Sequence, residues 1–206
     1  MQKSLLPPLA LVGGVILLVS CTSFKAERLQ DAKADDKAMT ITDAWVDGDT
    51  TRVIDDTLAQ IKSHPRFIRY QRQHAHTLKV FVGKVANDTS EAYFPVGDLE
   101  DALLDKLSRM DNFVLVDAQQ RETILKEITF QNSGTVDPAQ AKTIGKQTGA
   151  DAIIFGEIHM KPESRGGRTI KTYTVNFHFT DIQNAEEVCR TRSKINKYSE
   201  QSGSSL

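Results

Sequence analysis

The chain has 206 residues, with 26 Lys and Arg, 27 Asp and Glu, and a formal net charge of −1. This near balance gives no broad attraction to nucleic acid or to an anionic membrane surface, so we expect no nucleic-acid partner. The length suits one ordinary domain with its own core, and two cysteines are too few for a disulfide framework.

The first twenty residues have the pattern of an export signal. Lys3 supplies a positive start, and the apolar run over residues 5–19 is too short and wrongly flanked for a membrane span. The run ends in Leu-Val-Ser-Cys at residues 18–21, which matches the lipobox of bacterial lipoproteins. We therefore predict that residues 1–20 are removed and that Cys21 becomes a lipidated N-terminus. An ordinary cleaved signal with an incidental cysteine is the alternative.

A lipidated Cys21 would anchor the chain stably, because several acyl chains such as palmitate bind a membrane far better than one. An aspartate after the cysteine would resemble the inner-membrane retention signal, and Thr22 stands there instead. We therefore expect a lipid anchor in the outer membrane, with the protein facing the periplasm. Residues 21–39 would form a flexible tether, since they are rich in charged residues and have little to bury.

Residues 40–198 carry the pattern of one folded domain. Apolar residues at helical spacing predict helices over 49–61, 96–110, 117–131 and 138–148. Short apolar or alternating runs predict strands over 78–85, 113–116, 151–160, 171–181 and 188–195. The run at 113–116 is typical of a fully buried strand and leads directly into a helix. The predicted fold class is α/β, a single domain with a mixed β-sheet flanked by helices, followed by a disordered tail at 199–206.

Local signals set the expected boundaries. Asp49 is of the N-cap type for the first helix of the domain, and His64-Pro65 should stop that helix. Residues 66–76 then predict a basic, irregular connection, and residues 161–168 predict a Gly-rich basic loop.

No pattern of catalytic or metal-binding residues is complete. Gly145 and Lys146 superficially resemble a phosphate loop, but Gln140 occupies the place of the expected glycine. His74 and His76 have the spacing of two ligands on one strand face, yet no Cys or carboxylate pattern completes a site, and a solvated loop explains them. Capping and core packing account for the other candidates: Asp47, Asp49, Cys189 and Trp45. We expect no catalytic site, metal or cofactor.

The best candidate site is a surface. Over 171–181 the aromatic and aliphatic residues alternate with polar ones, so one set should face the core and the other, with Asn176 and His178, should face outward. The same period places the three basic residues of 188–195 on one face, and the adjoining loop adds more charge. The predicted partner-binding residues are Lys161, Arg165, Arg168, Asn176, His178, Arg190, Arg192 and Lys194. Such a patch would steer an acidic partner. The alternative is that these residues are merely solvated and protect a strand edge from aggregation.

Several segments in order resemble the LpoB family: KVFVGKVANDT at 79–89, FVLVDA at 113–118, QAK at 140–142, and GAD at 149–151 leading to Gly156-Glu157. The resemblance covers about residues 45–197. It implies a fold similar to the TolB N-terminal domain and to the core of CsgG-type secretion lipoproteins. The chain departs from the family pattern at Ala185, where Gly is usual, and at Cys189, where Trp is usual. Its tether is also short and proline-poor.

The resemblance implies an outer-membrane lipoprotein that activates a bifunctional penicillin-binding protein in peptidoglycan synthesis. The mechanism would be a population shift towards the active conformation of the synthase. The alternative is a structural subunit of a CsgG-like envelope assembly or secretion complex, which a ring in solution would indicate. An enzyme is a third reading, disfavoured because no polar residues converge in a catalytic pattern.

Overall fold

The computed structural model describes residues 26–74, 77–116 and 149–201. Cys21, His76 and Lys146 lie outside the described residues, as do the helices predicted over 117–131 and 138–148.

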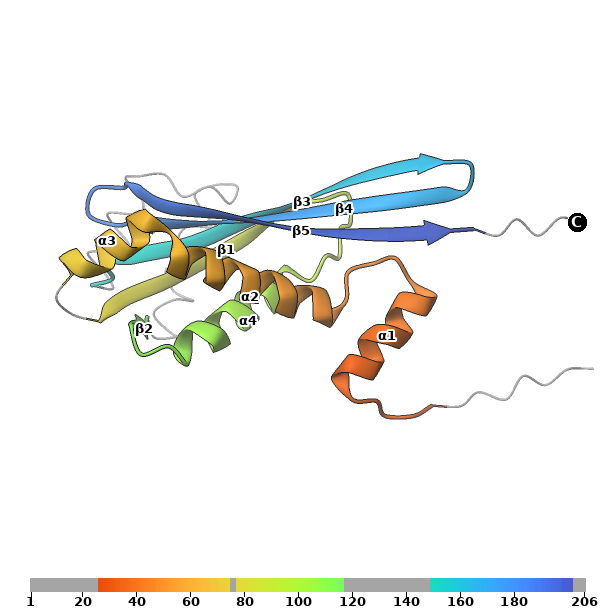
Figure 1. Cartoon of the computed structure of the whole chain (residues 1–206), viewed down its shortest axis with the longest axis horizontal. Coiled ribbons are helices and arrows are strands. Elements are labelled where there is room, and N and C mark those ends of the chain that lie inside the picture. The colour runs from red at the N-terminus through yellow and green to blue at the C-terminus, as the bar shows by residue number, and fades with distance from the viewer. Residues whose placement is uncertain (1–25, 75–76, 117–148, 202–206) are drawn as a thin grey trace, which may run out of the picture.

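Within these ranges, five strands form one mixed sheet in the order β2-β1-β3-β4-β5 (Figure 1). β1 (Leu78–Asp88) pairs in parallel with β2 (Phe113–Leu115) and with β3 (Ala152–Arg165). β4 (Arg168–Asp181) pairs antiparallel with both β3 and β5 (Glu187–Glu200). The predicted mixed sheet is therefore confirmed. β5 runs five residues beyond the predicted end at 195, into the segment that we expected to be a disordered tail.

The described residues form four helices beside the sheet: α1 (Asp31–Ile41), α2 (Asp47–Ser63), α3 (Pro65–Gln73) and α4 (Val96–Ser108). The main core lies between one face of the sheet and the apolar stripes of α2, α3 and α4 (Figure 1). β4 contributes the residues predicted to face inward, namely Tyr173, Val175, Phe177 and Phe179. Trp45 joins this core, with its ring centroid 5.1 Å from that of Phe94. A smaller cluster around Phe81 and Ile153 occupies the opposite face.

The prediction that 113–116 forms a fully buried strand is wrong. β2 has three residues and, among the described strands, lies at the edge of the sheet and pairs with β1 alone. Phe113 packs into the core, but Val114 is 49 % exposed. An apolar run cannot distinguish a central strand from an edge strand, because that distinction depends on the number of neighbouring strands.

The connection predicted to be irregular over 66–76 is mostly the helix α3. His64 ends α2 and also caps α3, where its Nδ1 accepts a hydrogen bond of 3.3 Å from the Arg66 N–H. Pro65 stops the first helix, as predicted, and at the same time takes the first position of the next. Asp49 is not the N-cap of α2. It is the third residue, and its carboxylate accepts from the Val46 N–H at 3.0 Å.

The loop predicted over 161–168 is a tight hairpin. β3 continues to Arg165 and β4 starts at Arg168, so only Gly166 and Gly167 form the turn. Their φ angles are 58° and 77°, and positive φ at both central residues is the conformation of a type I′ turn. The glycine pair therefore extends the ladder instead of ending it.

α1 occupies part of the segment that we expected to be a disordered tether. None of its residues is buried. Its contact with α2 includes a hydrogen bond of 3.1 Å from the Gly48 N–H to Asp35. This segment is therefore partly helical, but its helix does not pack into the core.

Candidate functional site

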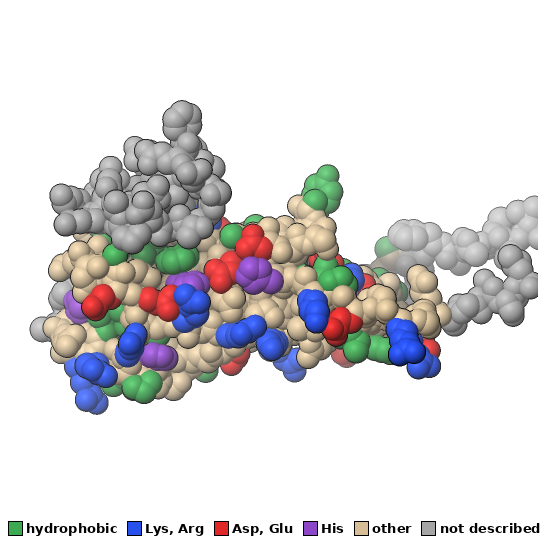
Figure 2. Space-filling model, turned by 90° about the horizontal axis from the view of Figure 1, so that it is seen from above, with side chains coloured by type: hydrophobic (Ala, Val, Ile, Leu, Met, Phe, Trp, Pro, Cys, Tyr) green, Lys and Arg blue, Asp and Glu red, His purple; other side chains and the backbone are tan. Residues whose placement is uncertain are grey.

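All eight residues of the predicted partner-binding set lie on one face of the sheet. We call the side opposite α2, α3 and α4, over strands β3, β4 and β5, the outer face. Residues directly opposite each other in an antiparallel ladder share a face. The ladder places the eight residues through the pairs Arg165–Arg168, Lys161–Thr172, His178–Arg190, Asn176–Arg192 and Thr174–Lys194. Figure 2 shows basic side chains gathered in a band along this face, with acidic and histidine side chains beside them.

The outer face is polar and mixed in charge rather than uniformly basic. Neighbouring glutamates pair with three of the predicted cations: Lys161 with Glu163 at 2.7 Å, Arg168 with Glu200 at 2.9 Å, and Arg190 with Glu187 at 3.0 Å. Across the part of the chain that the structure describes, no ion pair forms at the other three cations, Arg165, Arg192 and Lys194. The unpaired charge of the face is thus concentrated in the middle of β5 and at the hairpin tip.

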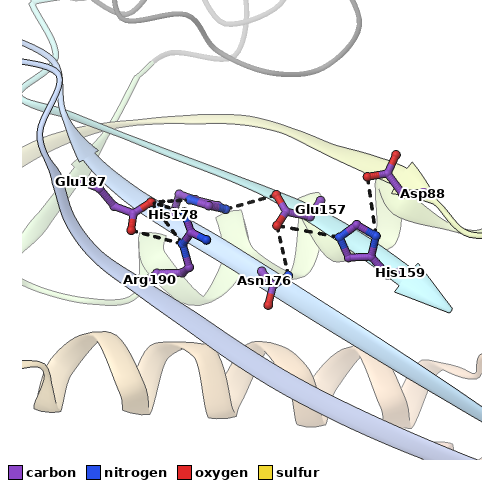
Figure 3. A network of polar contacts seen from close by, with 7 residues as sticks. All are labelled: Asp88, Glu157, His159, Asn176, His178, Glu187 and Arg190. Atoms are coloured by element: carbon purple, nitrogen blue, oxygen red, sulfur yellow. Dashed lines mark hydrogen bonds and ion pairs between the residues drawn. The ribbon is translucent and has the colours of Figure 1, made fainter. Parts of the chain in front are cut away.

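His178 points to the outer face as predicted, but it is not solvated. Only 9 % of its side chain is exposed, and its ring stacks on Phe155 with centroids 4.8 Å apart. Its Nδ1 lies 2.6 Å from a Glu187 oxygen and its Nε2 lies 3.2 Å from a Glu157 oxygen (Figure 3). A protonated imidazole can donate at both nitrogens, so His178 is placed to hold the two carboxylates together.

The two carboxylates connect further groups on the outer face. Glu157 accepts a hydrogen bond of 3.1 Å from the Asn176 amide, and its other neighbour His159 lies 3.8 Å from Asp88 (Figure 3). Burial raises the pKa of Glu187, but hydrogen bonds from Arg190 and His178 outweigh burial and lower that pKa overall. Glu187 therefore stays ionised and holds Arg190 in place.

Sequence reasoning missed the acidic members of this network. Glu157 belonged to a predicted strand, and its two-residue spacing from His159 would have placed both on one face. No local signal, however, pairs Glu157 with His178, because the two are 21 residues apart and meet only through the β3–β4 register.

The backbone of β5 is fixed behind the unpaired cations. The Arg192 N–H donates to the Gln60 side chain at 3.0 Å, and the Arg192 carbonyl accepts from the Gln60 amide at 3.1 Å. Ser193 hydrogen-bonds the Asp56 carboxylate as well. These side chains of α2 satisfy polar groups at the edge of the sheet, so this stretch of the edge is covered. The side chain of Arg192 therefore extends from a strand that is hydrogen-bonded to β4 on one side and to α2 on the other.

The other candidates have structural settings. His74 is the C-cap of α3, and its ring lies 4.2 Å from that of Tyr70, so it is not part of a solvated loop. Cys189 is 3 % exposed, and burial raises the pKa of its thiol to about 12, which confirms it as a buried filler. None of the helices within the described ranges is long and apolar enough to cross a membrane.

Fold and outer face together define a single mixed α/β domain that presents a polar sheet face. A family model described as peptidoglycan-synthase activator LpoB matches residues 49–195. The chain therefore belongs to the LpoB family of peptidoglycan-synthase activators, which confirms the resemblance inferred from its sequence. Proteins of this family are lipoproteins that face the periplasm.

Several solved structures are similar to this chain. LpoB from E. coli, solved by NMR, is 14 % identical, with 97 % of this chain and 84 % of that chain covered and a TM-score of 0.46. Lipoprotein GNA1162 from Neisseria meningitidis is 16 % identical, with 62 % and 88 % covered and a TM-score of 0.48. The LpoB C-terminal domain from Salmonella enterica is 15 % identical, with 62 % and 91 % covered and a TM-score of 0.45. No curated protein matches the chain.

Proposed function

We propose that this chain is an outer-membrane lipoprotein, anchored through Cys21, that binds a bifunctional penicillin-binding protein through its outer face and activates it. The observation that carries the proposal is that Arg192 and Lys194, two cations without ion pairs among the described residues, lie side by side on the outer face. The chain belongs to a family of synthase activators, so this face is the candidate contact with the synthase. These two side chains lie two residues apart on one strand, about 7 Å from each other along it.

Unpaired cations suit a steering role. Binding an acidic partner at Arg192 or Lys194 breaks no ion pair formed by the described residues, whereas Arg190 must first leave Glu187. Complementary charge raises the rate of encounter and fixes the orientation of the complex. Activation then follows if the lipoprotein binds the active conformation of the synthase more tightly than the inactive one.

The test uses residues 22–206 and the periplasmic part of the bifunctional penicillin-binding protein from the same cell. Affinity and glycan-strand polymerisation are measured for the wild type and for Arg192→Glu with Lys194→Glu. We expect about a tenfold or larger loss of affinity, because like charges then face each other across the interface. The matched control reverses Arg52 and Lys62, two exposed cations of α2 without ion pairs among the described residues.

Each result has a distinct meaning. Saturable binding with faster synthesis, lost in the β5 variant and kept in the α2 control, supports both the function and the face. Activation that survives the β5 reversal keeps the function and moves the contact elsewhere. Absence of both binding and activation by the wild-type chain contradicts the proposed partner and favours a structural role in an envelope assembly.

A further inference from the structure

A cavity of about 530 Å³ lies between α3 and the start of β5. Arg66, Arg69 and Tyr70 form its α3 wall, and Glu186, Glu187 and Val188 form the wall opposite. None of the eight predicted partner-binding residues lines the cavity. It adjoins the outer face through Glu187, whose side chain is bound by Arg190 and whose carbonyl accepts from the Arg66 guanidinium at 3.4 Å.

The α3 wall is cationic. α3 has the sequence PRFIRYQRQ, with three arginines and no acidic residue. Arg66 and Arg69 are three residues apart and therefore neighbours on one helix face. Neither guanidinium forms an ion pair with any side chain in the described part of the protein. On the same wall, the buried ring of Tyr70 is held by a hydrogen bond of 3.2 Å from its hydroxyl to the Asp151 carbonyl.

The opposite wall does not neutralise these charges. The Glu187 carboxylate is already bound by His178 and by Arg190, on the side of the outer face. The Glu186 carboxylate accepts a hydrogen bond of 3.4 Å from the Asn184 amide and forms no ion pair among the described residues. Among the described residues, the cavity thus offers two guanidiniums and one carboxylate that form no ion pair, with Arg66 held only by its hydrogen bond to the Glu187 carbonyl. That balance favours a monoanion, and a planar guanidinium binds a carboxylate with two parallel hydrogen bonds.

We propose that this cavity binds a carboxylate of the synthase, carried on an acidic segment that continues from the outer face around the start of β5. The inference rests on the proposed function and names a second, separate contact for the same partner. Continuity supports it, because Glu187 belongs to both surfaces. On this arrangement Arg192 and Lys194 steer the acidic segment, while Arg66 and Arg69 hold one carboxylate of it in the cavity.

The test uses the mature, lipidated chain in detergent and the whole bifunctional penicillin-binding protein. Arg66→Gln with Arg69→Gln removes both charges and keeps side chains of good helix propensity. We expect about a tenfold loss of affinity and a weaker dependence on salt, because two charged hydrogen-bonding groups are lost. Arg72→Gln is the matched control, since Arg72 lies on the same helix but does not line the cavity. Its affinity should stay within about twofold of the wild type.

Two further variants sharpen the result. Arg66→Lys with Arg69→Lys keeps the charge but removes the planar guanidinium that can donate two parallel hydrogen bonds. A loss of affinity smaller than that of the glutamine variant therefore indicates bidentate binding. Thermal unfolding of every variant shows whether the protein remains folded. If the double glutamine variant unfolds, the affinity of the double lysine variant is compared with the wild type instead. Wild-type affinity in the Arg66 and Arg69 variants, with loss in the β5 variant, overturns this contact and leaves the proposed function standing. Absence of binding by the wild-type chain overturns both.

Discussion

The Lys197 ammonium on β5 lies 2.5 Å from the Asp49 carboxylate in the first turn of α2, with 2 % and 11 % of the two side chains exposed. Its cross-strand neighbour Lys171 forms ion pairs of 3.0 Å with Asp43 and 3.1 Å with Glu91. Beyond the apolar core, towards the β3–β4 hairpin, ion pairs thus join the helix-covered face of the sheet to the segment before α2, to α2 itself and to the segment after β1. The Lys197–Asp49 pair fixes α2 against β5, and α2 in turn hydrogen-bonds the backbone of Arg192.

Replacing Lys197 should destabilise the domain strongly. Lys197→Met leaves Asp49 buried without its counter-ion, and losing one partner of a buried pair costs about 3 kcal/mol or more of the free energy of unfolding. Urea denaturation measures the change. Lys194→Met on the exposed side of the same strand is the control and should change stability by less than about 0.5 kcal/mol. Equal effects of the two substitutions would show that the Lys197–Asp49 pair contributes nothing specific.

Acid should weaken the Asp43 contacts. Hydrogen bonds from Ser199, first, and from Lys171 lower the pKa of Asp43 below its ordinary value. A carboxyl whose folded pKa is lowered stabilises the protein above the unfolded pKa of about 4, and this contribution is lost as the pH falls through the folded pKa. We therefore expect Asp43→Asn to be less stable than the wild type near neutral pH, with the difference shrinking in acid. Urea midpoints between about pH 3 and 7 measure it. A difference that is constant with pH would contradict the assignment.

Glycine at position 185 should stabilise the domain. Ala185 has a φ of 59°, the only positive φ among the described non-glycine residues. The left-handed conformation costs an L-residue about 1 kcal/mol or more, and glycine avoids this cost while losing more entropy on folding. Ala185→Gly should therefore raise the free energy of unfolding by about 0.5 kcal/mol. Ala59→Gly in the exposed interior of α2 should lower it by about 1 kcal/mol. A loss of stability in both would contradict the strain argument.

Cys189 should be unreactive in the folded protein. Burial, and to a lesser degree Glu187, raise the pKa of the thiol to about 12, and only the thiolate is nucleophilic. In residues 22–206 this is the only cysteine, so thiol labelling reports on it alone. At about pH 8 we expect labelling to follow unfolding, with a burst only after urea is added. Rapid stoichiometric labelling in native buffer would show that β5 opens locally.

Periodicity along the chain was enough to predict much of the fold and the orientation of the candidate site. Apolar spacing located α2, α4 and the long strands, and the alternation along β4 and β5 correctly separated Phe177 from Asn176 and Cys189 from Arg190. These features are local, because the direction of a side chain on a strand depends only on its position along that strand. The proline and glycine signals that mark the ends of elements were harder to interpret. Pro65 is compatible with the end of one helix and with the start of another, and Gly166-Gly167 suits a loop as well as a tight turn.

Tertiary structure alone decided which charges are free. The sequence by itself determined that Arg190, Arg192 and Lys194 share a face. An irregularity at the start of β5, where Phe179 pairs with Cys189 but Thr180 pairs with Glu187, brought Glu187 to that same face beside Arg190. The other two cations have no ion pair among the described residues. The β3–β4–β5 register buried His178 between Glu157 and Glu187, and the packing of α3 against β5 formed the arginine-lined cavity. The physical reason is that the free energy of a charge depends on neighbours brought from distant parts of the chain. Local periodicity carries no information about which distant segment will supply them.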